Sequence, residues 1–480
     1  MMAPKFVLLW SDTVLLLLAV ALLVYGIRVW RHAGLARNWR KVFQQAPALC
    51  ASVVLMLFLL VALADSLHFR RALTVAPGQP QAYATRTESL LDLALAAQVE
   101  GREVSYSAPL ATRAFAKLTE TVDGKVQRVH PRLAHGGAHL RDADADHLAD
   151  VLQRAAVGLL LGLGAALFAW GLSSLVLARL EASSVLAAAR QLLRNDTALP
   201  WRAALITLTV CMVLAGPVIA LASHYHVLGT DRTGNDVLYQ ALKSIRTAFV
   251  IGTLSTLATL PLAVVLGIMA GYFKGWVDEL IQYLYTVLSS IPNVLLIAAC
   301  VLMMQVFIDT HAELFETGAE RADVRLFLLC VILGVTGWAT LCRLLRAETM
   351  KLRELEYVQA ATAFGVGPWR IMARHVFPNV VHLIIITTVL EFSALILYEA
   401  VLSYVGVGVD PTMNSFGGMI NLARSEMSRD PVVWWSFAAA FGFMVALVLA
   451  ANLFADGVRD AFDPRARVFK LRRPGAQAAP

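Results

Sequence analysis

Residues 356–379 read EYVQAATAFGVGPWRIMARHVFPN, a polar and mixed passage enclosed by two apolar runs. Residues 352–364, which begin just before this passage and include its first third, are rich in good helix formers. The GVGP segment at 365–368 then favours a break, because glycine ends helices in the left-handed conformation and proline suits the first turn of the next helix. The passage therefore predicts a helix, a sharp turn and a short helix between two membrane spans.

The composition of the whole chain indicates a polytopic membrane protein. It has 480 residues, of which 58% are hydrophobic and only 16% are charged. The formal net charge of +7 is typical of a membrane protein with basic cytoplasmic loops, and we favour that interpretation over nucleic-acid binding. The five cysteines lie in or beside apolar runs and form no CxxC, so we expect neither disulfides nor a cysteine metal site.

The apolar runs predict an all-α fold with about nine transmembrane helices, since a bilayer needs about 20 apolar residues per helix. The expected spans are 6–28, 47–66, 155–178, 203–223, 247–272, 281–307, 326–343, 381–405 and 434–455.

Basic residues predict the orientation of these spans. The segment after the first span carries Arg28, Arg31, Arg37, Arg40 and Lys41 without an acidic residue. The 343–375 stretch and the tail from residue 456 are also basic, whereas the 307–325 loop is acidic. With nine spans, the positive-inside rule gives an N-terminus outside and a C-terminus in the cytoplasm. The opening passage would then face the cytoplasm.

Lengths and polarity divide the chain further. Residues 67–150 form an outward-facing insert with ten acidic and ten basic side chains, large enough for a small ordered subdomain. The expected divisions are an N-terminal extension with two spans (1–66), the outward-facing insert (67–150), a third extra span with a cytoplasmic linker (151–200), a membrane core of six spans (201–470) and a disordered tail (471–480).

The opening passage resembles the coupling loop, or EAA loop, of ABC importer permeases, specifically the C-subunit type of dipeptide and oligopeptide permeases (Dpp/Opp). The matching residues are Tyr357, Val358, Ala360, Ala361, Gly365, His375, Pro378 and Asn379. Further similar segments follow the family's order: GTDRTGNDVL (229–238), AGYFKGWVDEL (270–280), EAVLSYVGVGVDP (399–411) and ANLFADGVRDAFDPRAR (451–467). The resemblance covers residues 203–470 and implies a six-helix core of the type I importer, which three extra helices and the insert precede.

The chain departs from the family pattern at several places. Gln359 stands where the motif has its eponymous glutamate, and Tyr283 and Thr286 stand where relatives commonly place an arginine and an aspartate. Residues 1–200 have no counterpart in the six-helix core.

The resemblance implies a permease subunit of the bacterial inner membrane, with its N-terminus in the periplasm, that imports peptides or similar solutes by alternating access and is not itself an enzyme. The sequence has no GxxxxGK[ST] phosphate loop, so the energy would come from two separate ABC ATPase subunits. A second, B-type permease subunit, a periplasmic solute-binding protein and membrane lipid are the other expected partners. Nickel, opines or other small solutes are alternative substrates, and an ATP-independent carrier or channel is an alternative of another class.

Within the loop at 345–380, the residues expected to couple to the ATPase are Glu356, Tyr357, Gln359, Ala360, Ala361, Gly365, Gly367, Arg370, Arg374 and His375. Two other interpretations stay open: the loop could lie on the headgroups as an amphipathic segment, and its arginines could contact phospholipid.

Charged residues inside membrane spans are candidates for the translocation pathway, because they are costly to bury. Glu391 and Glu399 lie eight residues apart, about 80° around one helix. We predict that Glu391 binds a cationic group of the substrate, and for Glu399 we favour a structural hydrogen bond. Asp12, near the outer end of the first span, is interpreted as a snorkelling or capping residue.

Three histidines in the insert are a weaker candidate site. His130, His135 and His139 in VHPRLAHGGAHL are ligand types for nickel or zinc. The intervening proline and glycines make the spacing that of a loop rather than of one helix face. We therefore expect no metal site and no cofactor.

Overall fold

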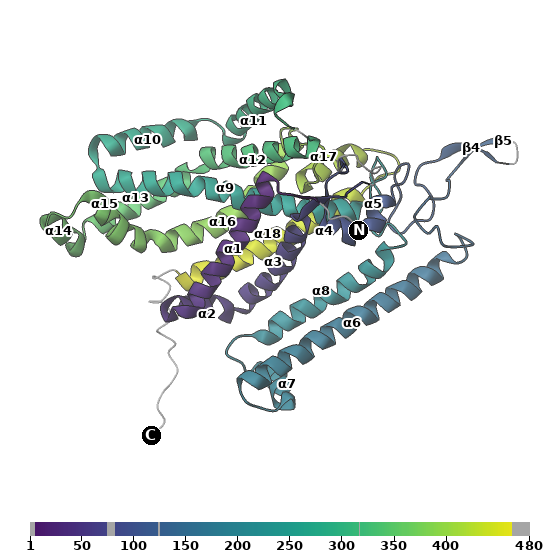
Figure 1. The fold of residues 1–480 in the computed structure, drawn as a ribbon, viewed down its shortest axis with the longest axis horizontal. Coiled ribbons are helices and arrows are strands. Elements are labelled where there is room, and N and C mark those ends of the chain that lie inside the picture. Colours follow the sequence, from purple (N-terminus) through teal and green to yellow (C-terminus); the bar gives the residue numbers. More distant parts are fainter. Residues whose placement is uncertain (1–4, 74–81, 123–124, 316, 463–480) are drawn as a thin grey trace.

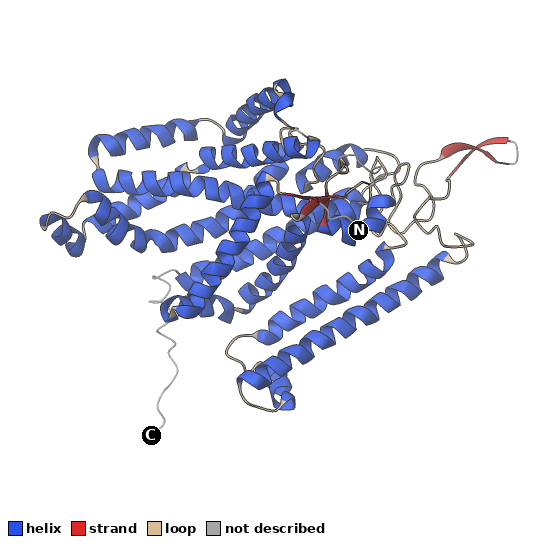
Figure 2. Ribbon diagram, viewed as in Figure 1, coloured by secondary structure: helices blue, strands red, loops and turns tan. Residues whose placement is uncertain are grey.

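The computed structural model describes residues 5–73, 82–122, 125–315 and 317–462, and in these ranges helices make up most of the chain (Figures 1 and 2). Many of the long helices lie side by side, and the few strands gather in the insert and at the start of the chain (Figure 2). The predicted tail, 471–480, lies outside the described residues.

Eight helices of the described ranges are long and apolar enough to cross a membrane. They are α1 (Trp10–Arg31), α3 (Ala46–Asp65), α6 (His147–Leu180), α8 (Trp201–Ala222), α9 (Val237–Phe273), α11 (Asn293–Thr310), the segment Pro368–Tyr404 and α18 (Trp435–Phe462). A ninth span results if α12 (Gly318–Gly337) and α13 (Ala339–Arg353), which are bent by 40° relative to each other, cross the membrane together. The expectation of about nine spans thus agrees with the helices.

The expectation of one continuous span at 281–307 is wrong. The structure divides it into α10 (Gly275–Ser290) and α11. Pro292 has no amide hydrogen and forces Ile291 out of the helical conformation, with φ −92° and ψ 133° at Ile291. The prediction missed this break because the run is predominantly apolar and contains only a single proline.

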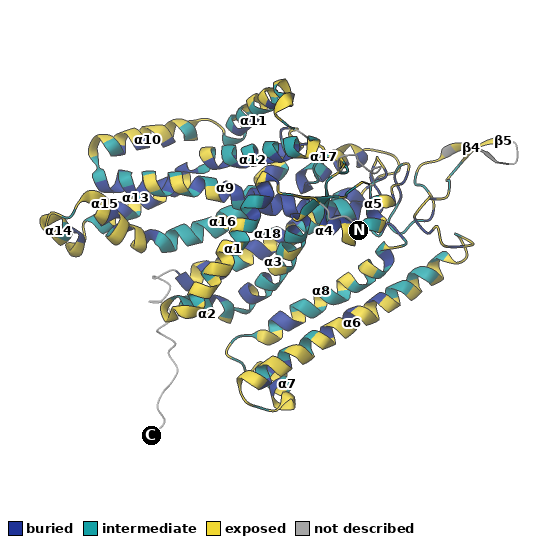
Figure 3. Cartoon of the chain, in the orientation of Figure 1, coloured by how far each residue is buried: buried dark blue, intermediate teal, exposed yellow. Residues whose placement is uncertain are grey.

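Helix α9 lies at the centre of the molecule and is its most buried long helix (Figure 3). Helices α3, α12, α13, α16 (Phe377–Tyr404) and α18 pack around it. A Cβ atom at Gly334 of α12 would lie 2.9 Å from the Ser255 carbonyl oxygen of α9. Glycine at this position therefore permits the close approach of these two helices.

Helices α6 and α8 form an antiparallel pair beside this bundle, with α7 (Val185–Arg194) at one end of the pair (Figure 1). A Cβ atom at Gly158 of α6 would lie 2.5 Å from the Gly216 carbonyl oxygen of α8. Small residues at such a crossing bring two helix backbones into direct contact, as is common in membranes.

The insert is tied to the start of the chain by a three-stranded antiparallel sheet of β1 (Lys5–Val7), β2 (His68–Arg70) and β3 (Glu88–Ser89). The segment 88–98 of the insert, ESLLDLALAAQ, contains α4 (Leu90–Ala94) and the start of α5 (Ala96–Glu100). Ser89 begins α4 as a capping box with Asp92. The hairpin of β4 (Leu118–Val122) and β5 (Lys125–Val129) projects away from the rest (Figure 1).

Shorter elements complete the chain. They are α2 (Ala33–Gln44), the 3₁₀ turn η1 (Ala312–Leu314), α14 (Glu356–Ala363), α15 (Pro368–Ile371), the π-helical turn η2 (Met372–Val376) and α17 (Phe416–Glu426). Helix α14 and the insert lie at opposite ends of the molecule (Figure 1). We call these the loop end and the insert end, and α9 runs between them.

Candidate functional site

The passage 356–379 forms a helix and a sharp turn, as its sequence predicts. The second helix is not a separate short one, because α15 continues through η2 into α16 as one helical segment, Pro368–Tyr404. Helix α14 ends at Ala363, and α15 starts at Pro368, the first helical position after the turn. Gly365 has φ +75°, a conformation that favours glycine. The Val366 amide donates to the Ala361 carbonyl over 3.1 Å and so closes the end of α14.

One detail of the prediction is wrong, because 352–364 is not a single helix. Helix α13 ends at Arg353 and α14 begins at Glu356, with Leu355 extended at φ −72° and ψ 140°. The Gln359 side-chain amide donates to the Glu354 carbonyl over 3.2 Å at this break. A carboxylate could not donate this hydrogen bond, which gives the departure from the motif glutamate a structural role.

The two arms of the loop are rooted in the helix bundle. Val358 of α14, Ile371 of α15 and Val376 of η2 are buried in one cluster with Leu345 of α13 and Ile268 of α9. Such close-packed contacts do not compress easily. The loop and the ends of α9, α13 and α16 are therefore packed into one cluster.

Polar contacts join the same loop to the end of α9. Lys274 Nζ lies 2.9 Å from Glu354 Oε1, and the Arg353 guanidinium donates to the Tyr272 carbonyl over 2.8 Å. The Arg353 guanidinium also lies 5.8 Å from the centre of the Tyr272 ring. Tyr272 and Lys274 lie just before α10, whereas Arg353 and Glu354 lie at the start of the loop.

The loop presents most of the predicted coupling residues to its surroundings. Ala361 and His375 are half-buried, and the Tyr357 and His375 rings lie 6.1 Å apart. The exposed residues are Glu356, Tyr357, Gln359, Ala360, Gly365, Gly367, Arg370 and Arg374. This arrangement leaves polar and small residues of the loop free to meet another surface.

Two aromatic residues at the tip were not among the predicted residues. The exposed fractions are 88% for Phe364 and 64% for Trp369. They flank the Gly365 turn, and large apolar residues beside a turn are the sequence signal that could have identified them. Exposed apolar residues grouped on a rigid protrusion are typical of a protein contact.

Glu391 and Glu399 of α16 differ in their surroundings. Glu399 is buried and accepts a hydrogen bond of 2.6 Å from the Ser403 hydroxyl. Glu391 is half-buried and has no hydrogen-bond or ion-pair partner among the described residues. The first is therefore satisfied within the chain, whereas the second is available to another group.

At the insert end, a buried ion cluster surrounds Arg246 of α9. Its Nε atom donates to Asp12 Oδ1 over 2.8 Å, and a second carboxylate, Asp323 of α12, lies 3.7 Å away. The His68 Nδ1 atom lies 2.7 Å from Asp12 Oδ2. The interpretation of Asp12 as a snorkelling or capping residue is wrong, because the bundle places a cation from 234 residues downstream against it.

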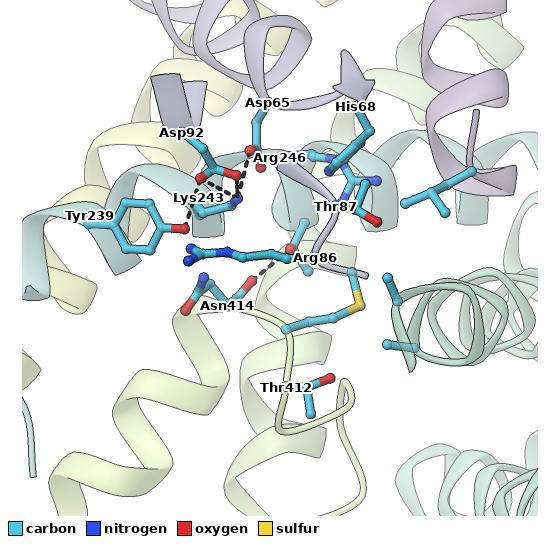
Figure 4. A pocket seen from close by; sticks show the side chains of 15 residues that line it. Asp65, His68, Arg86, Thr87, Asp92, Tyr239, Lys243, Arg246, Thr412 and Asn414 are labelled. Atoms are coloured by element: carbon cyan, nitrogen blue, oxygen red, sulfur yellow. Dashed lines mark hydrogen bonds and ion pairs between the residues drawn. The ribbon is translucent and has the colours of Figure 1, made fainter. Parts of the chain in front are cut away.

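A second cluster surrounds Lys243, one turn before Arg246 (Figure 4). Lys243 Nζ lies 2.8 Å from Asp92 Oδ1 and 3.1 Å from Asp65 Oδ1. The Tyr239 hydroxyl donates to Asp92 over 2.8 Å. Thus residues 1–100, which lie outside the predicted core, provide three carboxylates (Asp12, Asp65 and Asp92) to two cations of the central helix.

A third cluster joins the insert to the segment 229–236. The Glu103 carboxylate accepts three amide hydrogen bonds, from Ala134, His135 and Gly136, at 2.9, 2.7 and 3.0 Å. The Glu103 amide in turn donates to the Gly234 carbonyl over 3.0 Å. Burial opposes ionisation of this carboxyl, but His226 and the three amides outweigh it and lower its pKa to about 2.

His226 lies between two carboxylates of this third cluster. Its Nδ1 atom lies 2.8 Å from Asp236 Oδ2, and its Nε2 atom lies 3.5 Å from Glu103 Oε1. Burial alone would lower the pKa of His226, but the two carboxylates raise it to about 9. This histidine is therefore a cation at neutral pH.

The three histidines of VHPRLAHGGAHL have different environments. His139 Nε2 lies 2.8 Å from Asp150 Oδ2, and His130 Nδ1 lies 3.0 Å from the Ala114 carbonyl. The His135 amide binds Glu103. Among the described residues, no group of three or more histidine, cysteine, aspartate or glutamate side chains could hold a metal ion.

Known proteins are similar to the part of the chain that includes the loop. Residues 263–468 match the family described as "Binding-protein-dependent transport system inner membrane component". The oligopeptide transport system permease protein OppC of Mycobacterium tuberculosis is 31% identical over 297 residues, which cover 59% of this chain and 95% of the relative. The glutathione transport system permease protein GsiD of Pectobacterium atrosepticum is 33% identical over 243 residues, which cover 51% of this chain and 74% of the relative.

A solved structure of the MetNI methionine ABC transporter in inward-facing conformations aligns with 46% of this chain and 93% of its own chain. Its sequence identity is 17% and the TM-score is 0.34.

The curated relatives are matched over most of their own length, and the region that matches the family contains the loop, α13, α16 and the end of α9. Members of this family are components of transport systems that also have ATPase subunits and a solute-binding protein. The chain belongs to the family of binding-protein-dependent transport system inner membrane components.

Proposed function

We propose that this chain is the permease subunit of an ATP-driven importer that carries peptides or peptide-like solutes across the inner membrane. The observation that carries the proposal is the protruding helix–turn–helix of residues 356–379, which is packed into the ends of α9, α13 and α16. The named relatives include permeases of oligopeptide and glutathione transport systems, and these names support peptides as the substrate class.

In this proposal the loop end faces the cytoplasm, the insert end and N-terminus face the periplasm, and the C-terminus is cytoplasmic. The basic residues of α2 and α13 support this orientation by the positive-inside rule. The central part of this permease is then the core (201–470). Its peripheral part consists of the extension (1–66), the insert (67–150) and the third extra span with its linker (151–200).

The proposed partners are two ABC ATPase subunits, a B-type permease as the second half of the pathway, and a periplasmic binding protein. The permease itself catalyses no reaction, and ATP hydrolysis takes place on the ATPases. Their closure would move the loop, and the rigid helices joined to it would switch the pathway between inward-open and outward-open states.

At the contact with an ATPase, Phe364 and Trp369 would provide apolar area, and Arg370 and Arg374 would provide charge. A hydrophobic centre with a polar rim is typical of protein interfaces. Ala360, Ala361 and Gly365 have small side chains that permit close approach of the partner.

We further propose that Glu391 belongs to the translocation pathway and binds a cationic group of the solute. Its lack of a partner among the described residues distinguishes it from Glu399, which Ser403 engages. Glu391→Gln should reduce peptide uptake about tenfold or more, because a charge-assisted hydrogen bond is lost. Unchanged uptake at equal expression would refute this role.

The transport function is tested by reconstituting the permease with its ATPase and B-type partners in liposomes, with the binding protein added outside. Labelled alanylalanine should accumulate with ATP and not with a non-hydrolysable analogue. Accumulation without ATP would indicate a carrier, and failure of the ATPases to co-purify with the permease would refute the proposal.

A further inference from the structure

A polar cavity of about 210 Å³ lies at the insert end, between the central helix and the parts of the chain that precede the predicted core (Figure 4). The N-terminal extension and the insert contribute Leu9, Asp65, His68, Arg86, Thr87 and Asp92. Helix α9 contributes Tyr239, Lys243, Arg246 and Thr247, and α12 contributes Ala319 and Ala322. The loop before α17 contributes 412–414. Because the cavity needs both parts, relatives without residues 1–200 would not have it.

The hydrogen-bond acceptors of this cavity are already occupied. Asp65 and Asp92 face Lys243 over 3.1 and 2.8 Å. The Ser89 hydroxyl also donates to Asp65, and the Tyr239 hydroxyl to Asp92. These two carboxylates are therefore not available to bind a cationic group of a ligand.

The donors, in contrast, are partly unused. Arg86 has no ion pair or hydrogen bond among the described residues, and its side chain extends across the cavity toward Tyr239 and Asn414 (Figure 4). The Thr87 hydroxyl is buried without a hydrogen-bond partner. The Asn414 side-chain amide has no partner among the described residues, although its backbone carbonyl accepts from Thr247 over 2.7 Å.

We propose that this cavity binds the carboxylate end of a small peptide, with Arg86 as the residue that pairs with the carboxylate. The planar guanidinium can meet both carboxylate oxygens at once, and Thr87 and Asn414 supply further donors. The choice of a peptide as ligand rests on the proposed transport function, and the site would hold the solute beside the central helix before translocation.

Charge and size narrow the ligand class. Asp65 and Asp92 line the same cavity, and they would repel a dianion such as phosphate more strongly than a single carboxylate. The cavity is smaller than the usual pockets for drug-sized ligands, which begin at about 300 Å³. It therefore suits a dipeptide or the last residues of a longer peptide.

The test is equilibrium binding to the purified full chain in lipid nanodiscs, measured by calorimetry with alanylalanine, alanylalanine amide and inorganic phosphate. Alanylalanine should bind at one saturable site, and the amide and phosphate should bind at least tenfold more weakly. Arg86→Gln should weaken alanylalanine binding at least tenfold, and Thr87→Val should weaken it severalfold. Arg128→Gln, an equal loss of charge on the exposed β5 strand of the same insert, should bind like the wild type.

The inference is overturned if Arg86→Gln binds alanylalanine as tightly as the wild type, if the amide or phosphate binds as well as the free dipeptide, or if no saturable binding occurs. These measurements need no ATPase. Binding with the expected pattern but without ATP-driven uptake would contradict the transport function alone, whereas uptake without this binding would contradict the site alone.

Discussion

At the scale of residues, the most consequential finding is that the central helix carries two cations whose carboxylate partners come largely from outside the predicted core. Arg246 faces Asp12 and Asp323, and Lys243 faces Asp65 and Asp92. Removing one partner of a buried pair leaves an uncompensated charge and is far more costly than removing an exposed pair. These contacts make the first two spans and the insert part of one folded unit with α9.

Asp12→Asn tests this view directly. The substitution should lower the free energy of unfolding by about 3–5 kcal/mol, because Arg246 keeps its charge and loses its nearest carboxylate. Thermal unfolding of the full chain in detergent measures the effect. Glu88→Gln, which removes the partner of the largely exposed Arg71, is the control and should change the value by less than about 1 kcal/mol. Equal unfolding temperatures for Asp12→Asn and the wild type would contradict this account.

The His226 cluster predicts a specific dependence of stability on pH. Its pKa is about 9 in the folded protein and 6.5 in its ordinary state, so the folded state binds the proton more tightly. The stabilisation is complete below pH 6.5 and is lost as the pH rises through 9. The difference in unfolding temperature between the wild type and His226→Gln should therefore shrink between pH 6.5 and 10. A constant difference over that range would show that the charge of His226 does not contribute.

At the scale of elements, the loop at the end opposite the insert combines a defined turn with buried roots. Gly365 and Gly367 both have open space around the position of a Cβ atom. Only Gly365 has a positive φ, because Gly367 has φ −60° and ψ 145°, which any residue adopts. The two glycines therefore separate the effect of backbone conformation from that of side-chain volume.

Gly365→Ala should impair coupling, because the left-handed conformation costs an alanine about 1–2 kcal/mol. Gly367→Ala should be close to neutral. Peptide-stimulated ATP hydrolysis by the reconstituted transporter is the measurement, and we expect a severalfold decrease for Gly365→Ala alone. Equal decreases for both variants would indicate that bulk, and not the turn, matters at this surface.

The elements also indicate how much the sequence alone could predict. The turn at 365–368 was predictable because glycine and proline act locally, and most spans were predictable because a long apolar run has few alternatives to a membrane helix. The break at Pro292 was missed because the hydropathy of the run outweighed one residue. The break at Leu355 was missed because nothing in its local composition marks it.

At the scale of the whole molecule, what the sequence could not predict depends on contacts between distant residues. The partner of Asp12 is Arg246, and that of Glu103 is the 134–136 segment together with His226. No local pattern encodes these pairs. The same holds for the cavity at the insert end, which forms only when α9, the start of the chain and the insert come together.

The whole molecule thus has a loop that projects at one end and a charged, solute-sized cavity at the other, with α9 between them. For an importer driven by ATP, this arrangement places the proposed ATPase contact and the proposed solute contact at opposite ends of α9. The central claim is that the loop end is where the ATPase binds.

Site-specific crosslinking tests this claim most directly. Phe364→Cys at the loop tip and Val104→Cys on the insert, both at exposed positions, would be compared in the complex co-expressed with its ATPase subunits. The native cysteines are buried or half-buried, so the new thiols should dominate the reaction. The account predicts a crosslink to an ATPase subunit from residue 364, changed in yield by ATP, and none from residue 104. Absence of the crosslink from 364 in an intact complex, or its appearance from 104, would contradict the account.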